Sequence, residues 1–197
     1  MSASVPEPSE HFVVADAAAW RRWLDEHEGT HDGVWLVLAK KGTTDPTSMN
    51  YDEALLEALC SGWIDGQKRS RDATTFLQRF TPRRRASLWS TRNVGIVASL
   101  IAQGRMRERG QAEIDRAKAD GRWDRAYAGS ATLTVPDDLH VALVATPAAA
   151  AVFASLNSAN RYAVLHRVVT AATATTRAAR IERLVAELAE GRAPHPE

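Results

Sequence analysis

Seven residues between positions 65 and 93 have the types and spacing needed to bind an anion. Guanidinium groups bind phosphate or carboxylate through paired hydrogen bonds, and the free amides at a helix start also hold anions. Tryptophan rings nearby can stack on a flat ligand. The predicted ligand-binding residues are Asp65, Lys68, Arg79, Arg83, Trp89, Ser90 and Asn93.

Asp65 supports two interpretations. Buried acids are normally paired, so the first is a structural salt bridge that orients Arg79 or Arg83. The second is the acid–base group of an enzyme that acts on a small anionic substrate held by the arginines. A cleft that brings Asp65 and Arg79 together would support this second interpretation, and an exposed basic ridge with no pocket would count against it.

Two further motifs fit structural roles better than chemical ones. Residues 27–31 match the H-E-x-x-H pattern of zinc proteases, which needs one unbroken helix. Gly29 interrupts that helix, so we predict no metal site. Cys60 lies on the apolar face of a predicted helix, where a cysteine packs in the core rather than acting as a nucleophile. We assign no catalytic residue and no cofactor.

The charge distribution singles out the same stretch. The 197-residue chain has 25 Lys and Arg against 24 Asp and Glu, a formal net charge of +1. Residues 65–92 carry eight basic and two acidic side chains, whereas residues 1–64 carry four basic and eleven acidic ones. Such an excess either attracts anions or pairs with acids within the fold. Nucleic-acid binding is less favoured, because the isoelectric point of about 8.0 is low for such proteins.

The elements that position these residues fall into two regions. Residues 11–92 predict an α+β region with a small antiparallel sheet, helices and a basic loop. Residues 93–191 predict an all-helical half that packs on the first region as one unit. Residues 1–10 are predicted to be a flexible tail, and residues 192–197 a second tail.

Local patterns predict where individual elements begin. Asp16 is a helix N-cap, and Asn50 with Glu53 forms a capping box. Strands are predicted at residues 12–14 and 33–41, and two more meet at a turn near Asp72. The first helix should present one face with Trp20, Trp23, Leu24 and His27. The helix after residue 92 should bury Val94, Val97, Ala98 and Ile101.

Composition sets the general class of protein. Hydrophobic residues make up 45% of the chain, which excludes wholesale disorder. The chain has no apolar run long enough for a membrane-spanning helix, so membrane insertion is not expected. The first ten residues lack the pattern of a secretion signal, and a single cysteine suits a reducing compartment. We therefore expect a cytoplasmic protein.

Several strings resemble the bacterial YdeI/OmdA family, which is described as bacteriocin-protection, YdeI or OmpD-associated. The resemblance extends from about residue 11 to residue 191, and its strings from Cys60 to Asp65 and from Arg79 to Arg83 are the most specific. It is carried by Trp20-x-x-Trp23-Leu24, Gly33-Val34-Trp35-Leu36, Tyr51-x-Glu53-Ala54-Leu55, Cys60-x-Gly62-Trp63-Ile64-Asp65, Arg79-Phe80-Thr81-Pro82-Arg83, Trp89-Ser90, Gly104-Arg105-Met106 and Asn160-Arg161-Tyr162.

The resemblance implies a role in stress, bacteriocin or antimicrobial-peptide resistance, and its name implies association with an envelope porin. It carries over no reaction and no catalytic residue. Our leading hypothesis is a protection protein with a basic anion-binding surface at the seven residues named above. The alternatives are an enzyme for a small anionic substrate that uses Asp65, and a weak nucleic-acid binder.

Overall fold

The chain divides into two units near residue 123, beyond the boundary expected at residue 92. The computed structural model describes residues 11–129 and 132–195. The mixed unit, named for its strands and helices, comprises the chain up to residue 87 together with residues 93–123. The helical unit comprises residues 88–92 and the chain from residue 124 onward.

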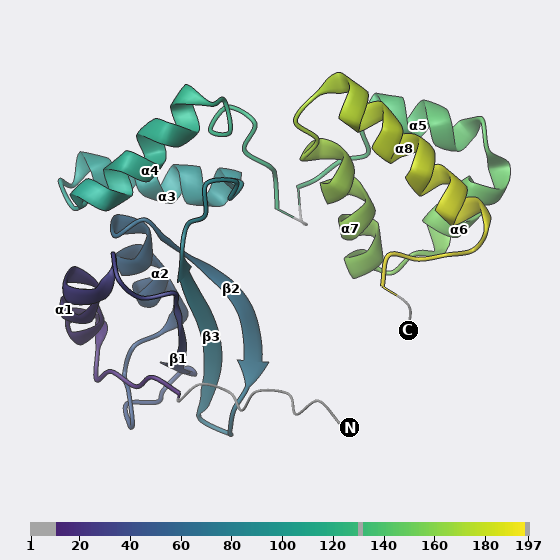
Figure 1. Cartoon of the computed structure of the whole chain (residues 1–197). Helices are drawn as coiled ribbons and strands as arrows, with labels where there is room; N and C mark the ends of the chain where they lie inside the picture. Colours follow the sequence, from purple (N-terminus) through teal and green to yellow (C-terminus); the bar gives the residue numbers. More distant parts are fainter. Residues whose placement is uncertain (1–10, 130–131, 196–197) are drawn as a thin grey trace, which may run out of the picture. The chain divides into compact units, whose positions relative to one another are not determined.

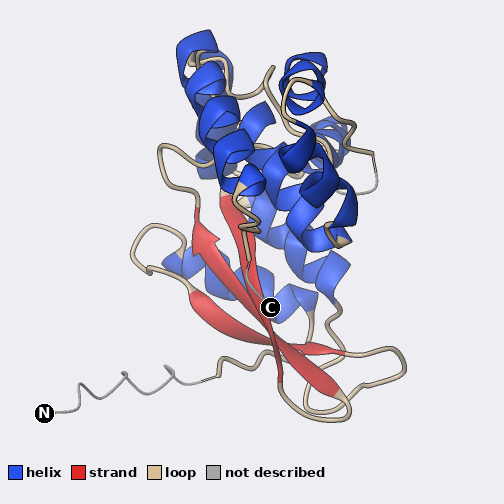
Figure 2. Cartoon of the chain, turned by 90° about the vertical axis from the view of Figure 1, so that its right-hand side faces the viewer, coloured by secondary structure: helices blue, strands red, loops and turns tan. Residues whose placement is uncertain are grey.

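The mixed unit contains the small antiparallel sheet that the sequence predicts (Figure 2). Its strands are β1 (Val34–Ala39), β2 (Trp63–Ser70) and β3 (Thr75–Pro82). They lie in the order β1-β3-β2, so β3 is paired on both sides. The α+β fold class expected for this part of the chain is therefore confirmed.

The turn between β2 and β3 lies where it was predicted. The Oδ1 atom of Asp72 accepts hydrogen bonds from the backbone amides of Thr74 and Thr75 at 2.9 and 2.7 Å. The strand predicted at residues 12–14 is wrong in extent, because only Phe12 forms a bridge, which runs parallel to Leu36 of β1.

Helices α1 (Ala17–His27) and α2 (Tyr51–Cys60) begin at the predicted caps (Figure 1). Asp16 Oδ1 accepts a hydrogen bond from the Ala19 amide at 2.8 Å. The capping box of Asn50 and the third helical residue is complete on α2.

One face of the sheet is covered by α1. Trp20 of α1 is fully buried and contacts Phe80 of β3 at a ring-centroid distance of 5.8 Å. Successive strand residues point to opposite faces, so Phe76 shares the covered face with Phe80. Arg79 therefore lies on the other face, where it is paired in register with Trp35 of β1.

Helices α3 (Thr91–Ala102) and α4 (Glu108–Ala119) place most of their residues in the mixed unit. Gly110 of α4 lies so close to α2 that an added Cβ would be 2.1 Å from the Cys60 carbonyl oxygen. Cys60 is 1% exposed, as its predicted core role requires. Burial is the main cause that raises the pKa of the Cys60 thiol, and the negative charge of Glu57 raises it further. The thiol therefore stays protonated.

The face predicted for α3 is wrong by part of a turn. The buried residues are Asn93, Val97 and Leu100, an i, i+4, i+7 stripe, whereas Ile101 is 41% exposed. The predicted face was built from apolar residues alone. The buried face of α3 includes the polar Asn93 and is therefore turned away from Ile101.

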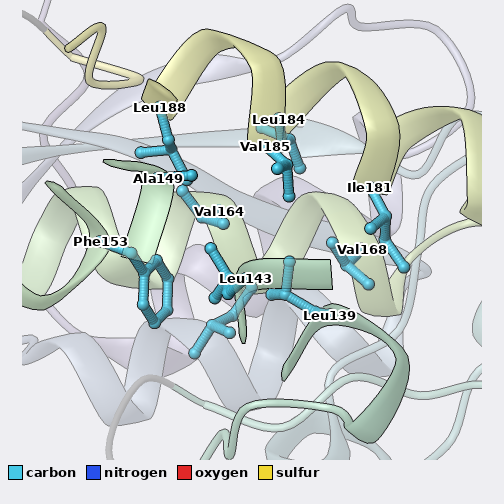
Figure 3. Packing of buried hydrophobic residues seen from close by; sticks show 11 residues of the cluster. Leu139, Leu143, Ala149, Phe153, Val164, Val168, Ile181, Leu184, Val185 and Leu188 are labelled. Carbon is cyan, nitrogen blue, oxygen red and sulfur yellow. The ribbon is translucent and has the colours of Figure 1, made fainter. Parts of the chain in front are cut away.

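The helical unit is built from four further helices around one apolar core (Figure 3), which confirms the all-helical prediction for this half. They are α5 (Asp137–Val144), α6 (Pro147–Ser155), α7 (Ser158–Val169) and α8 (Ala174–Ala189). Among the described residues, no single helix is long and apolar enough to cross a membrane, although α5 and α6, bent by 119°, reach that standard when taken together.

The predicted N-terminal tail, residues 1–10, lies outside the described residues, as do residues 196–197 of the predicted C-terminal tail. His195 is held in place by Asn160 of α7, which is 4% exposed. Its Oδ1 accepts a hydrogen bond from the His195 amide at 2.7 Å, and its Nδ2 donates one to the His195 carbonyl at 3.1 Å.

Candidate functional site

The structure distributes the seven predicted ligand-binding residues over both units. Trp89 and Ser90 belong to the helical unit, where the Trp89 carbonyl accepts a hydrogen bond from the Tyr127 amide at 3.0 Å. The mixed unit holds Asp65, Lys68, Arg79, Arg83 and Asn93.

Asp65 and Arg79 lie on opposite faces of the sheet. Asp65 is paired with Phe80 across the strands and so shares the face covered by α1. There it accepts a hydrogen bond from the Tyr51 hydroxyl at 2.8 Å. Gly66, the next residue, faces Arg79 on the other side. Asp65 and Arg79 therefore do not face each other across a cleft.

Among the other predicted residues of the mixed unit, Lys68 lies on the covered face, and Arg83 and Asn93 are nearly buried. Lys68 is exposed, and its Nζ lies 4.3 Å from the ring centroid of Phe76 on the covered face. Arg83 is 5% exposed, and its amide donates a hydrogen bond to the Gly62 carbonyl. Asn93 is 6% exposed in the buried stripe of α3. These side chains do not make a continuous basic surface with Arg79.

A pocket of about 450 Å³ lies beside Arg79, where the end of α1 meets the start of β1. Three of its lining residues are histidines and three are aromatic, so stacking and hydrogen bonding are both available. The residues lining this histidine–tryptophan pocket are His11, Phe12, Trp23, His27, His31, Gly33, Val34 and Trp35.

A stack of flat rings leads along α1 to this pocket. The rings of Trp20 and Trp23 are nearly parallel, with centroids 5.2 Å apart, and His27 stacks on Trp23 at 4.7 Å. His31 meets Trp23 edge-on at 5.2 Å. The helical spacing of these residues on α1 brings the rings into register.

The Nδ1 atoms of the two histidines in the H-E-x-x-H motif have opposite roles: one donates a hydrogen bond and the other accepts one. His27 Nδ1 donates to the Trp23 carbonyl at 2.8 Å, so the neutral ring has an acceptor at Nε2. His31 Nδ1 accepts from the Gly33 amide at 3.2 Å, so its neutral ring has a donor at Nε2. Helix α1 ends at His27, as the position of Gly29 predicts. No group of three potential metal ligands occurs among the described residues.

Arg79 supplies a cation at the edge of the pocket. Its guanidinium lies against Gly33, since a Cβ added there would be 3.1 Å from Arg79 Nη2. Partial burial lowers the pKa of Arg79, and the nearby Asp32 carboxylate opposes that shift. Among the described residues, the guanidinium has no hydrogen-bonded or ion-paired partner. The neighbouring Arg69 is stacked over Trp35 at 4.2 Å.

The helical unit has a separate, apolar groove of about 680 Å³ between α5 and α8. Asp138 and Arg177 pair at its edge, with Arg177 Nε and Nη2 at 2.5 and 2.8 Å from the carboxylate oxygens. The hydrogen bonds from Arg177 lower the pKa of Asp138. The groove is lined by Asp138, Ala142, Ala145, Thr146, Ala174, Arg177, Ala178, Ile181, Glu182, Val185 and Ala186.

The fold is that of an α+β unit joined to a separate helical unit, and each unit has a concave site of its own. Residues 12–113 match the model of a domain of unknown function (DUF8412), and residues 132–191 match the model described as bacteriocin-protection, YdeI or OmpD-associated. The chain thus belongs to the DUF8412 family, and its helical unit carries a domain of the YdeI/OmdA family. No curated protein and no solved structure shows significant similarity to it.

These matches confirm the resemblance and limit its extent. The YdeI/OmdA model matches the helical unit, whose pattern was the weaker part of the resemblance. The strings around Asp65 and Arg79 lie within the domain of unknown function. The link with bacteriocin protection therefore comes from the description of the YdeI/OmdA family, whose model matches residues 132–191.

Sequence reasoning missed the histidine–tryptophan pocket, although two of its signals were visible. The face shared by Trp23 and His27 was assigned only to packing, and the H-E-x-x-H spacing was tested only as a metal site. His11 gave no signal, because the bridge between Phe12 and Leu36 brings it to the pocket from another part of the sequence.

Proposed function

We propose that this protein acts in resistance to bacteriocins or related antimicrobial peptides, and that its helical unit binds the peptide directly. One observation carries the proposal: the groove between α5 and α8 is apolar and lies in the unit that matches the bacteriocin-protection model. Its volume of about 680 Å³ suits several apolar side chains. Val141 and Val144 of α5, 66% and 65% exposed, are further apolar side chains on the same helix, outside the groove lining.

The occupant that fits this groove is the apolar face of a cationic amphipathic helix. Such a helix places side chains at i, i+3, i+4 and i+7 into an apolar groove. Charge favours a cationic partner, because Arg177 is neutralised by Asp138 while Glu182 adds a negative charge to the lining. Helix α5 carries two acidic residues in its first turn and no lysine or arginine.

Filling the groove should abolish peptide binding. Ala178 is exposed and lines the groove, so Ala178→Trp would occupy the space of the peptide side chains without disturbing the core. We expect a fluorescently labelled amphipathic helix of leucine and lysine to bind at least about tenfold more weakly by anisotropy, the loss of roughly one buried anchor.

The matched control is Ala179→Trp, the next residue on α8, which is exposed and lies outside the groove. It should bind the peptide as the unaltered protein does, and should preserve survival of bacteriocin-treated cells that Ala178→Trp fails to protect. Equal affinity for both variants, or no binding to the unaltered protein, would contradict the proposal.

A second candidate function, anion binding, is favoured by Arg79. Its half-buried guanidinium has no hydrogen-bonded or ion-paired partner among the described residues, and it borders a pocket with three histidines. The guanidinium is only partly buried and has Asp32 nearby, so its N–H groups are available for charge-assisted hydrogen bonds to an anionic ligand. This site keeps one of the seven predicted residues and replaces the predicted surface with a pocket.

Neutralising Arg79 should remove anion binding. In an NMR titration with phosphate and with acetate, we expect Arg79→Gln to weaken binding at least about tenfold, because a charge-assisted contact is worth roughly 1.5–3 kcal/mol. Arg84→Gln, an exposed neighbour on the basic loop, is the control and should leave affinity unchanged. Equal losses in both variants would point to a diffuse basic surface. Binding of an oligonucleotide that falls steeply with salt would instead support the nucleic-acid hypothesis.

A further inference from the structure

We infer that the ligand held beside Arg79 is a planar heteroaromatic acid, whose ring enters the histidine–tryptophan pocket while its carboxylate pairs with the guanidinium. This inference rests on the second candidate function, which supplies the anion site, and it adds the chemical class of the ligand.

The walls and size of the pocket fit a ligand of one or two fused rings. A volume of about 450 Å³ lies in the lower half of the range for small-molecule sites. Phe12, Trp23 and Trp35 line it together with three imidazoles, whereas Val34 is its one aliphatic side chain. Aromatic walls favour flat ligands through offset stacking and edge-to-face contacts.

The ring stack on α1 provides a surface for such a ligand. Trp20, Trp23 and His27 are parallel to within 13° and 9° at successive steps. His27 is the last ring of this stack, and its side chain is 39% exposed. Because Trp23 is held by Trp20 beneath it and by the edge of Trp63 at 5.7 Å, the platform is rigid before a ligand arrives.

The polar edges of the pocket explain the preference for a heteroaromatic ring. The neutral His27 ring presents an acceptor at Nε2, and the neutral His31 ring presents a donor at Nε2. A ring that carries an N–H and a separate acceptor can satisfy both imidazoles, whereas a hydrocarbon ring satisfies neither.

The cation that fixes the acid group is Arg79 rather than its neighbour. Arg69 stacks with its face over Trp35, and none of the contacts of the described residues places it against a residue of α1 or against Gly33. Arg79 lies next to Trp35 across the strands and against Gly33 of the pocket lining. Arg79 itself does not line the pocket, so a carboxylate on the ring would have to reach past Gly33 to meet the guanidinium while the ring stays against Trp23 and His27.

Three matched acids test the class of ligand by calorimetric titration of the full chain. Benzoate and cyclohexanecarboxylate differ in the flat ring, and indole-3-carboxylate adds a ring N–H. We expect affinity to rise at least about fivefold from cyclohexanecarboxylate to benzoate, and further to indole-3-carboxylate. Methylation of the indole nitrogen should remove the gain in affinity of indole-3-carboxylate over benzoate.

A histidine variant tests the polar edge. His27→Phe keeps a ring on Trp23 but removes the Nε2 acceptor, so it should bring the ratio of indole-3-carboxylate affinity to benzoate affinity down to about one, whatever the affinity for benzoate itself. His140→Phe, an exposed histidine on α5, should change neither acid. Retention of the indole advantage in His27→Phe would overturn the assigned edge.

The outcomes separate this inference from the anion site. Equal affinity for benzoate and cyclohexanecarboxylate, with both lost in Arg79→Gln, would leave the anion site standing and overturn the aromatic class. Absence of binding for all three acids and for phosphate would overturn both. Circular dichroism and thermal unfolding of each variant establish that a loss of binding is not a loss of folding.

Discussion

Replacing Gly110 by alanine is expected to lower the free energy of unfolding of the mixed unit by about 3 kcal/mol. The added Cβ would lie 2.1 Å from the Cys60 carbonyl oxygen and 2.8 Å from its carbonyl carbon, and both are backbone atoms that cannot turn aside. Helices α2 and α4 would have to separate, and the hydrogen bond from the Arg107 amide to the Cys60 carbonyl, 3.1 Å long, would lengthen. Urea unfolding monitored by tryptophan fluorescence measures the change.

Gly95 provides the matched control for this prediction. It also lies inside a helix, α3, but a Cβ added there meets no atom within 4 Å. Alanine should therefore stabilise the protein by roughly 0.5–1 kcal/mol, the usual gain from replacing a helical glycine. If both substitutions stabilised the unit, the close approach of α2 and α4 would be wrong.

Replacing Glu57 by alanine is expected to destabilise the mixed unit by roughly 3 kcal/mol, the lower end of the range for breaking a buried ion pair. The Glu57 side chain is 10% exposed and binds Arg105 at 2.5 Å and Arg107 at 2.8 Å. Arg107 would keep a second ion pair, from its Nε to Asp25 Oδ1 at 2.6 Å, and the Arg105 side chain is 34% exposed to water. The loss of stability therefore stays at the lower end of the range. Urea unfolding again gives the measurement.

Asp115 of α4 is the control for Glu57, because its carboxylate is exposed and accepts a hydrogen bond from Gln111 on the surface of the helix. Asp115→Ala should change the free energy of unfolding by less than about 0.5 kcal/mol. Similar effects at the two positions would mean that the ion pairs of Glu57 contribute no more than surface ones.

The parts of the fold that local sequence encodes were predictable. The caps at Asp16 and Asn50 depend on residues within three positions, and so does the turn at Asp72. Each is decided by a hydrogen bond from a side chain to nearby backbone, which leaves a readable pattern. The stretch at residues 12–14 lacked such a device, and it forms a single bridge instead of a strand.

The candidate site was less predictable, because it depends on which face of the sheet each side chain occupies. Asp65 and Arg79 are both half-buried members of one charged segment, yet the pairing of Asp65 with Phe80 sends them to opposite faces. A shift of one residue in register would have brought them together. The charged segment can be recognised from the sequence, but the pairing register of β2 with β3 cannot be predicted from local sequence patterns.

The same limit explains the histidines. Residues 27–31 were judged by the requirements of a zinc helix, and helix α1 ends at His27, before the motif is complete. That break also turns His31 back toward Trp23, so the feature that argued against the metal site forms one edge of the pocket. The spacing of the two histidines alone does not tell whether they have no shared site or line a different kind of site.

The clamp of Asn160 on His195 has a practical consequence for all of these measurements. A shortened protein that stops at the end of α8 would leave a carboxamide that is 4% exposed without the amide and carbonyl that now satisfy it. Trimming by a carboxypeptidase would act in the same way and would loosen α7. Affinity tags and fluorophores should therefore be attached so that the segment from α8 to His195 stays in place.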